Sequence, residues 1–387
     1  MRTPPVTEFE AAGGLVRVQL EGCHATIAAG TEAIANWALS YLGSWWPETE
    51  RIAIGQTADR VDAVVTGCVD PEGYRQVVSF VAADAEPTTT FIRVPGFRRI
   101  VDGVVYAHCP ERRVAYVHNP VDGTIRVVGP DESQVKLDTA RIARMLVTNE
   151  LEQRGWVVLH AACVIGPEGG VLVIGNKGAG KTTLSLILSS LGTRALLAND
   201  RCLVRTDGNV VQALPWPGSV SIGFGLLTGL GWAELAARSI RNGAEQHPFQ
   251  HSDVAALLAA GSFTPRFGED GRELKFEVMV PQLAECFGID VATEGKIGRV
   301  YFPQITSQAP RGPARSVRQH ESFTEHVLFG PASGYPNFLE LTPVLPPEQR
   351  AATAELLRAL GDLPAYEVAL SLDAARNRSA LSGGWPD

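Results

Sequence analysis

The chain has 387 residues, of which 45% are hydrophobic and 20% charged, so it can bury a core and is longer than one typical domain. Its net charge of −8 argues against a general affinity for nucleic acid or for an anionic membrane, because both need an excess of Lys and Arg. Six cysteines lie far apart without a CxxC pair. Neither a zinc site nor a disulfide framework is predicted, and a reducing, cytoplasmic location is expected.

Residues 1–130 are predicted to form a β-rich N-terminal domain. Short runs such as LVRVQL, RIAIG, DAVVTGCV, QVVSFVA and TTFIRV have strand character. The pairs Asp102-Gly103 and Asp122-Gly123 lie between β-rich runs and predict tight hairpins, since Gly accepts the positive φ that such turns need. TEAIANWALSYLGSWW is the one helix expected here, and this part of the sequence contains no catalytic constellation.

Residues 131–387 are predicted to form an α/β domain, with the boundary at GPDES. Apolar residues at helical spacing run from Leu137 to Leu151 and stop before Gly155, where a C-terminal glycine belongs. WVVLHAACVIG and GVLVIG are continuous apolar runs, as expected of strands in a sheet that is covered on both faces. A helix over 182–191, a strand RALLA and a hairpin around Asp207-Gly208 follow.

The segment from Gly208 to Ala233 carries no charged side chain, which raises the question of a membrane span. It contains Pro215, Pro217 and several glycines, and lipid cannot satisfy the backbone groups that such residues leave unpaired. We therefore expect buried strands and turns, and no membrane association.

A phosphate-binding loop is the strongest motif of the chain. It fits G-x-x-x-x-G-K-[ST], follows a predicted strand and precedes a predicted helix. The backbone N–H groups of such a loop and the helix N-terminus bind a triphosphate, the lysine reaches the β- and γ-phosphates, and the hydroxyl binds Mg²⁺. The candidate nucleotide contacts are Gly175, Asn176, Lys177, Gly178, Ala179, Gly180, Lys181, Thr182 and Thr183, with Arg201 further along the chain.

Three residues near this loop are candidates for the chemistry. Asp200 ends a predicted strand 19 residues after Lys181, a position from which a carboxylate can bind the metal or take a proton from an acceptor hydroxyl. Asn199 is a candidate metal ligand or a support for Asp200. His160, in the strand before the loop strand, has small apolar neighbours that would let it approach a phosphate or orient Asp200, although a histidine in an apolar run is more often a core residue.

The segment from Leu159 to Val204 resembles the centre of the HPr kinase/phosphorylase superfamily, which is related in fold to phosphoenolpyruvate carboxykinase. The resemblance implies a P-loop core behind a separate N-terminal domain, and ATP- and Mg²⁺-dependent phosphoryl transfer to a hydroxyl. Its central residues fall on His160, Lys181, Thr182 and the pair Asn199-Asp200. Asn199 replaces the first Asp of the family's pair, and the glycine-rich signature EVRGLG of true HPr kinases is absent, so HPr itself is a poor candidate substrate.

The predicted function is therefore transfer of the γ-phosphate of ATP to a peptide serine or a small-molecule hydroxyl, with Asp200, His160 and Lys181 as catalytic residues. Further cations are needed around the γ-phosphate.

The alternatives are a nucleotide-dependent ATPase or sensor without a phosphoacceptor, and a carboxykinase-like decarboxylation, which is disfavoured because no second set of metal ligands is found. A homo-oligomer is compatible with the sequence. The candidate cations are Arg201 beside Asp200, then Arg266, Lys275 and Arg299, and the segment from Trp216 to Gly225 suits either a substrate-side loop or packing strands.

Overall fold

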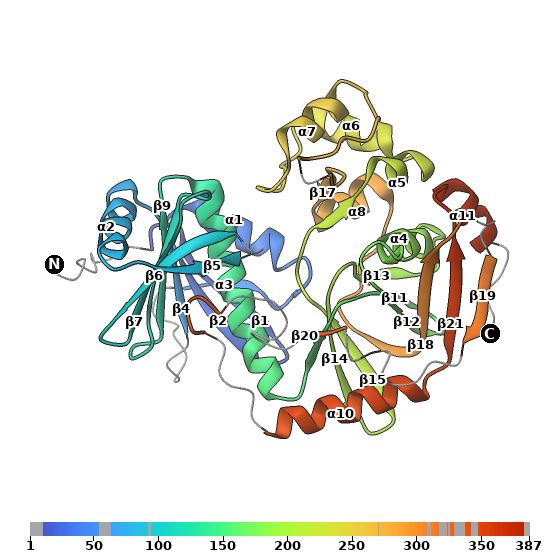
Figure 1. The fold of residues 1–387 in the computed structure, drawn as a ribbon, viewed down its shortest axis with the longest axis horizontal. Coiled ribbons are helices and arrows are strands. Elements are labelled where there is room, and N and C mark those ends of the chain that lie inside the picture. Colours follow the sequence, from blue (N-terminus) through green and yellow to red (C-terminus); the bar gives the residue numbers. More distant parts are fainter. Residues whose placement is uncertain are drawn as a thin grey trace. The chain divides into compact units, whose positions relative to one another are not determined.

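The structure is a computed structural model that describes residues 11–53, 63–91, 94–269, 271–307, 311–316, 323, 326–328, 337–341 and 347–382. It is a mixed α/β protein whose chain divides into two compact units, coloured in chain order in Figure 1. The first unit contains residues 1–154 and 329–349, and the second contains 155–328 and 350–387. The segment 131–154, which the sequence assigned to the second domain, thus lies in the first unit. Each unit is described by itself.

The first unit is built on a nine-stranded sheet in the order β3-β1-β2-β4-β9-β8-β7-β6-β5. Its β-strands are β1 (Gly14–Leu20), β2 (Cys23–Ala29), β3 (Glu50–Ile52), β4 (Val64–Val69), β5 (Glu86–Thr89), β6 (Pro95–Val101), β7 (Val104–Cys109), β8 (Val114–Asn119) and β9 (Thr124–Gly129). Its helices are α1 (Glu32–Tyr41), α2 (Pro71–Ala82) and α3 (Glu132–Gln153).

The predicted Asp-Gly hairpins are present in this sheet. Val101 pairs with Val104 across Asp102-Gly103, where both turn residues have positive φ, at 50° and 79°. Asn119 pairs with Thr124 across the second turn, with Gly123 at φ 67°. The two positive φ values at Asp102-Gly103 match the twist of the flanking strands, whereas the four-residue connection at the second turn needs a positive φ only at Gly123.

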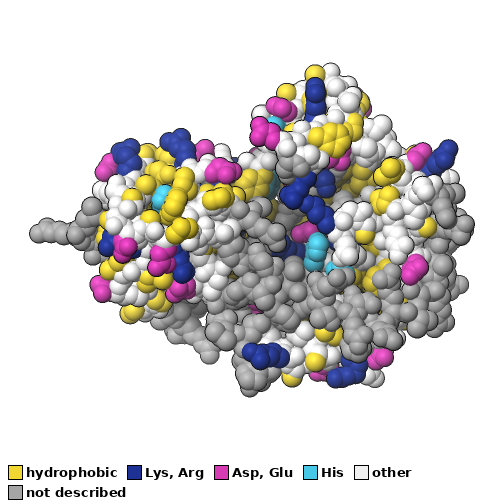
Figure 2. All heavy atoms as spheres, viewed as in Figure 1, with side chains coloured by type: hydrophobic (Ala, Val, Ile, Leu, Met, Phe, Trp, Pro, Cys, Tyr) yellow, Lys and Arg dark blue, Asp and Glu magenta, His cyan; other side chains and the backbone are white. Residues whose placement is uncertain are grey.

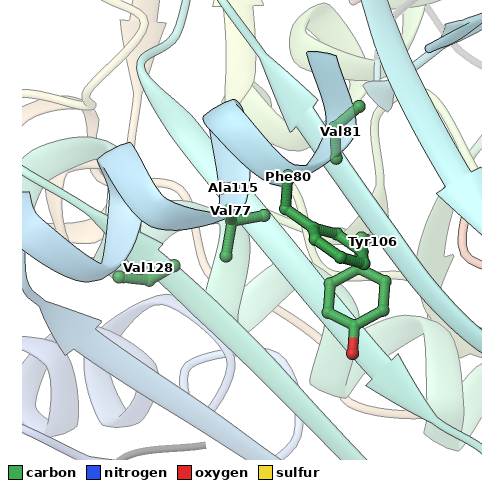
Figure 3. Packing of buried hydrophobic residues seen from close by; sticks show 6 residues of the cluster. All are labelled: Val77, Phe80, Val81, Tyr106, Ala115 and Val128. Carbon is green, nitrogen blue, oxygen red and sulfur yellow. The ribbon is translucent and has the colours of Figure 1, made fainter. Parts of the chain in front are cut away.

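The segment QVVSFVA, expected as a strand, is part of helix α2. Asp70 caps this helix by accepting a hydrogen bond from the Gly73 N–H, and Pro71 occupies its first turn, where a missing N–H costs nothing. The apolar residues of the segment recur at helical rather than alternating spacing, so one face of α2 packs on β7, β8 and β9 (Figure 3). This cluster contains Val77, Phe80, Val81, Tyr106, Ala115 and Val128.

Helices α1 and α3 cover the face of the sheet opposite α2. In β8, Ala115 packs in the α2 cluster while the next residue, Tyr116, donates a hydrogen bond to Asp138 of α3, and successive strand residues point to opposite faces. At Gly67 of β4, a Cβ atom would lie 2.5 Å from Thr139 Oγ1 and 3.2 Å from Ile34 Cγ2. Glycine there lets both helices approach the strand closely.

The second unit is built on a ten-stranded sheet in the order β13-β11-β12-β18-β15-β14-β10-β20, with β21 paired to β18 and to β19. The strands of the second unit are β10 (Val157–Leu159), β11 (Ala161–Gly166), β12 (Gly169–Ile174), β13 (Ala195–Ala198), β14 (Cys202–Asp207), β15 (Val210–Pro215), β16 (Val220–Ile222), β17 (Phe276–Val278), β18 (Gly295–Ile305), β19 (Arg311–Ser316), β20 (Val327–Leu328) and β21 (Ala365–Leu370). Strands β16 and β17 form a separate two-stranded sheet.

The helices of the second unit fall into two groups in Figure 1. Helices α4 and α11 pack against each other, and α4 also packs on β11, β12 and β13, while α5 to α8 lie together with β16 and β17. The helices are α4 (Lys181–Ser190), α5 (Phe224–Gly229), α6 (Ala233–Arg241), α7 (Ser252–Ala259), α8 (Val280–Phe287), α10 (Pro347–Asp362), most of it in this unit, and α11 (Ala374–Leu381).

The run WVVLHAACVIG, expected as one strand, is divided at His160 into β10 and β11. β10 pairs with β14 and β20, whereas β11 pairs with β12 and β13, so the chain changes partners at this residue. The expected hairpin around Asp207-Gly208 is present between β14 and β15, with Gly208 at φ 58°. In the described part of the chain, no helix combines the length and the apolarity needed to cross a bilayer.

Candidate functional site

The glycine loop joins the end of β12 to the start of α4. Gly178 and Gly180 have φ of +86° and +104°, a region that only glycine enters without strain, and the Ala179 N–H donates to the Asn176 carbonyl at 3.1 Å. A Cβ atom on Gly175 would lie 3.0 Å from the Ala179 side chain. No described side chain caps the start of α4, so no side-chain acceptor competes there for the first-turn N–H groups, as in sites that bind phosphate.

The ammonium group of Lys181 lies inside the curl of this loop. Its Nζ donates to the carbonyl of Gly175 at 2.6 Å and approaches the carbonyl of Asn176 at 3.5 Å, and the residue is only 9% exposed. Burial lowers the pKa of Lys181, while the negative charge of Asp200 acts in the opposite direction. The two charges therefore interact, which links the loop to the carboxylate that follows β13.

Asp200 is held from two sides. His160 Nε2 lies 3.3 Å from Asp200 Oδ1, and Arg201 Nε lies 3.5 Å from Asp200 Oδ2. Burial acts to raise the pKa of Asp200, but the hydrogen bond from His160 and the charges of Arg201, His160 and Lys181 outweigh it, so the pKa lies below its ordinary value. The carboxylate, with a side chain that is 61% exposed, is therefore ionised at neutral pH and open to solvent.

Strand register explains why His160 and Arg201 are neighbours. Leu159 of β10 pairs with Cys202 of β14, so the next residue on each strand, His160 and Arg201, also lies side by side. On the other edge of β10, the His160 N–H donates to the carbonyl of His326 at 2.8 Å, and the two imidazole rings are 6.4 Å apart. His326, which is 4% exposed, was missed in the sequence because its only signal was a position just before a short apolar pair.

The candidate metal ligands come from the start of α4 and from the end of β13. Thr182 is the second residue of α4, and Asn199 lies between β13 and Asp200. Asn199 Oδ1 is buried and accepts no hydrogen bond in the part of the chain that the structure describes, an uncommon state for a buried oxygen. An oxygen donor without a described partner, one residue before an ionised carboxylate in the chain, is of the ligand type that Mg²⁺ prefers. Among the described residues, no cluster of three His, Cys, Asp or Glu side chains is found.

The remaining predicted cations have different surroundings. Arg266 and Lys275 are exposed side chains between α7 and β17, and Arg299 belongs to β18, where its positive charge acts to lower the pKa of Tyr301 against the effect of burial. Lys177, at the third position of the glycine loop, is exposed. Figure 2 shows Lys and Arg side chains of the second unit gathered beside histidine and acidic side chains, in the region between α8 and β14.

The segment from Trp216 to Gly225 contains β16 and the start of α5. Strand β16 pairs with β17, and the hydroxyls of Ser219 and Ser221 both donate to the carboxylate of Glu277, each at 2.7 Å. Packing therefore accounts for the β16 part of this segment. Trp216 is different, because it follows the last residue of β15 at the level of Arg201.

Neither a family model nor a curated protein matches the sequence. Among solved structures, the Hpr(Ser) kinase/phosphatase from Coxiella burnetii is 14% identical to this chain, over 42% of this chain and 72% of that one, with a TM-score of 0.22. A likeness of this size carries no argument about fold or activity. The functional case for this protein therefore depends on its own residues.

Proposed function

We propose that the protein is an ATP- and Mg²⁺-dependent kinase with a P-loop core, and that it transfers the γ-phosphate to a hydroxyl of a peptide or of a small molecule. One observation carries the proposal: the ammonium of Lys181 is curled into a glycine loop, and the carboxylate of Asp200, which acts to raise the pKa of that lysine, is contacted by His160 and Arg201. A phosphate-binding loop facing a fixed carboxylate is the arrangement that phosphoryl transfer needs, because this reaction depends mainly on positioning and on neutralising charge.

The nucleotide side of the site would be formed by the residues 175–183. Their N–H groups and the N-terminus of α4 would bind the β- and γ-phosphates, and Lys181 would exchange the carbonyls of Gly175 and Asn176 for phosphate oxygens. Mg²⁺ would be bound by Thr182 and Asp200, with Asn199 as a further oxygen donor. It would supply positive charge to the phosphates as the bond to ADP weakens.

Asp200 would act on the acceptor side. The acceptor oxygen forms a bond to the γ-phosphorus, the bond from that phosphorus to the bridging oxygen of ADP breaks, and the hydroxyl proton passes to the Asp200 carboxylate. A carboxylate whose pKa is low is a weak base, but the transition state of phosphoryl transfer is loose and needs the hydroxyl oriented more than deprotonated early. His160 fixes the orientation of Asp200 through its contact with Oδ1.

The second candidate function is a nucleotide-dependent ATPase or sensor that binds a partner and has no phosphoacceptor. The observation that favours it is Asn199, which supplies a buried oxygen without a charge where a second carboxylate would strengthen metal and base chemistry. In that case water would take the place of the acceptor hydroxyl. The carboxykinase-like reaction is the weakest candidate, since Asn199, Asp200 and Thr182 supply at most one set of metal ligands.

An ATP-supplied, reducing compartment such as the cytoplasm suits this proposal. All six cysteines are free thiols, and burial raises the pKa of Cys202 and of Cys163 well above ordinary values, so neither is a reactive thiolate. The expected partners are a nucleotide and a hydroxyl-bearing substrate, rather than nucleic acid or a membrane.

The test is an incubation with γ-labelled ATP, Mg²⁺ and panels of serine peptides and small hydroxyl compounds. A kinase transfers the label to one class of acceptor, and Asp200→Asn keeps ATP binding while lowering transfer by roughly a hundredfold or more. Label found only as inorganic phosphate, across every acceptor tried, supports the ATPase alternative. Transfer by Asp200→Asn at the wild-type rate would show that the carboxylate has no part in the chemistry.

A further inference from the structure

Arg201 is backed by an aromatic ring that the strand register places beside it. Cys202 of β14 pairs with Pro215 of β15, so the residues one step further, Arg201 and Trp216, lie directly across from each other. The guanidinium carbon of Arg201 lies 4.9 Å from the centre of the Trp216 ring. Side chains at opposed positions of neighbouring antiparallel strands leave the sheet on the same face, which explains the contact.

Arg201 therefore contacts both a carboxylate and an aromatic ring. Its Nε lies 3.5 Å from Asp200 Oδ2, and its guanidinium carbon lies over the ring of Trp216, with 23% of the side chain exposed. The ion pair alone holds Arg201 weakly, because the Asp200 side chain is 61% exposed and exposed ion pairs gain little over their contacts with water. An arginine on a tryptophan face loses much of its rotational freedom and keeps its charge.

We propose that Trp216 is a positioning residue that holds Arg201 where its guanidinium can contact both Asp200 and the phosphoryl group during transfer. The inference rests on the proposed kinase function. Lys181 interacts with Asp200 from the glycine loop, and Arg201 contacts Asp200 Oδ2. A phosphoryl group that moves from ATP to an acceptor hydroxyl near Asp200 would thus be close to two cations, Lys181 and Arg201. Lys181 is fixed by the loop, and Trp216 fixes Arg201.

The first experiment compares Trp216→Leu with Trp216→Phe. Leucine removes the ring and should lower kcat roughly tenfold, while the affinity for Mg·ATP changes less than about twofold, because the contact of Arg201 with the phosphoryl group is expected to strengthen in the transition state. Phenylalanine keeps an aromatic face and should restore most of the rate. Equal kcat values for Trp216→Leu and the wild type would overturn the inference, as would an equal loss in the two variants.

A double-mutant cycle tests whether Trp216 acts through Arg201. If it does, Trp216→Leu has no further effect on kcat in an Arg201→Ala background, whereas independent roles give losses that multiply. The matched control lies at the other end of β14, where the Arg205 guanidinium carbon is 4.5 Å from the centre of the Trp156 ring. Arg205→Ala removes the same type of contact away from Asp200 and should leave kcat unchanged.

A spectroscopic measurement tests the positioning role of Trp216 separately from the proposed kinase function. The ring of Trp216 should shift the NMR resonances of the Arg201 guanidinium upfield, and the shift should vanish in Trp216→Leu and persist in Trp216→Phe. This result does not depend on turnover. A wild type that transfers no phosphate defeats the kinase proposal alone, whereas an Arg201 resonance at its unshifted position in the wild type defeats the assignment of Trp216.

Discussion

The two units use charged side chains in opposite ways. In the first unit, Asp138 is fully buried and accepts hydrogen bonds from Arg112 at 2.7 Å and from Tyr116 at 2.6 Å, with Arg141 at 3.4 Å. In the second unit, Asp200 has a histidine and an arginine as neighbours, but its side chain is 61% exposed, and the side chains of His160 and Arg201 are 33% and 23% exposed.

The difference shows which charges are free to act on a ligand. The Asp138 cluster lies between α3 and the sheet, and both oxygens of the Asp138 carboxylate accept hydrogen bonds from protein groups, so the cluster contributes to the fold. The Asp200 cluster is at the end of strands, beside a loop whose lysine bonds only to main-chain carbonyls and beside an asparagine oxygen without a partner in the described chain. Similar residue types thus serve structure in one unit and, we propose, chemistry in the other.

The largest expected effect comes from Asp138→Ala. Removing the carboxylate leaves the Arg112 and Arg141 side chains, each 5% exposed, as like charges in a buried site, and should lower the free energy of unfolding by about 3–5 kcal/mol. Urea unfolding checks this prediction. Asp138→Asn, which keeps an oxygen acceptor, should cost less. Asp138→Ala with wild-type stability would contradict a structural role for the cluster.

Lys181→Met should reduce ATP binding without reducing stability. Without the ammonium, ATP affinity should fall roughly a hundredfold, as expected for loss of a buried contact between charged groups, while the free energy of unfolding stays the same or rises because a buried cation is removed. Calorimetry with Mg·ATP measures the affinity. Lys296→Met, an exposed lysine at the start of β18, is the matched control and should bind as the wild type does. Unchanged affinity in Lys181→Met would exclude the glycine loop as the nucleotide site.

A smaller effect is expected at the N-terminus of α2. Asp70→Ala removes the cap that accepts from the Gly73 N–H at 2.8 Å and the partner of Arg126 at 3.3 Å, and should lower the free energy of unfolding by about 1 kcal/mol. Chemical denaturation is the measurement, with ATP affinity as the control, since α2 belongs to the first unit. A change in ATP affinity would break the division of roles between the units.

The smallest effect concerns pH. Burial lowers the pKa of His108 and of His118, and for His118 a hydrogen bond to the Leu339 carbonyl acts in the opposite direction. The neutral form of both histidines is thus favoured in the folded state. Below about pH 6.5 the unfolded chain therefore binds more protons than the folded chain does. Stability should therefore fall as the pH drops below that value. Urea midpoints between pH 7.5 and pH 5 test this, and His108→Gln should flatten the curve; equal curves would contradict the assignment.

Local signals in the sequence predicted some elements well. Asp-Gly turns, the glycine loop and the stop of α3 before Gly155 depend on residues next to one another, and each is present. The segment that became α2 was misread because its run of Val and Phe suits a strand as well as a helix, and the cap at Asp70 was overlooked. A short apolar run cannot distinguish the two periods without its flanking residues.

The geometry of the candidate site was predictable only in part. The loop and Asp200 are close in the sequence, and their contribution to one site follows from a strand and a helix between them. The row formed by His326, His160, Arg201 and Trp216 depends on the register of strands β20, β10, β14 and β15. Pairing between segments so far apart is decided by packing of the whole sheet, which no local pattern records.

The division of the strand run at His160 has a consequence for how this protein can change over evolutionary time. The N–H of residue 160 completes the ladder with the carbonyl of residue 326, while the imidazole of the same residue contacts Asp200. The main chain of His160 thus contributes to the sheet, while its side chain contributes to the candidate site. A substitution at residue 160 that keeps the main-chain N–H keeps the donor for this bond, so the side-chain contact with Asp200 can be varied, by selection or in the laboratory, without removing a hydrogen bond of the sheet.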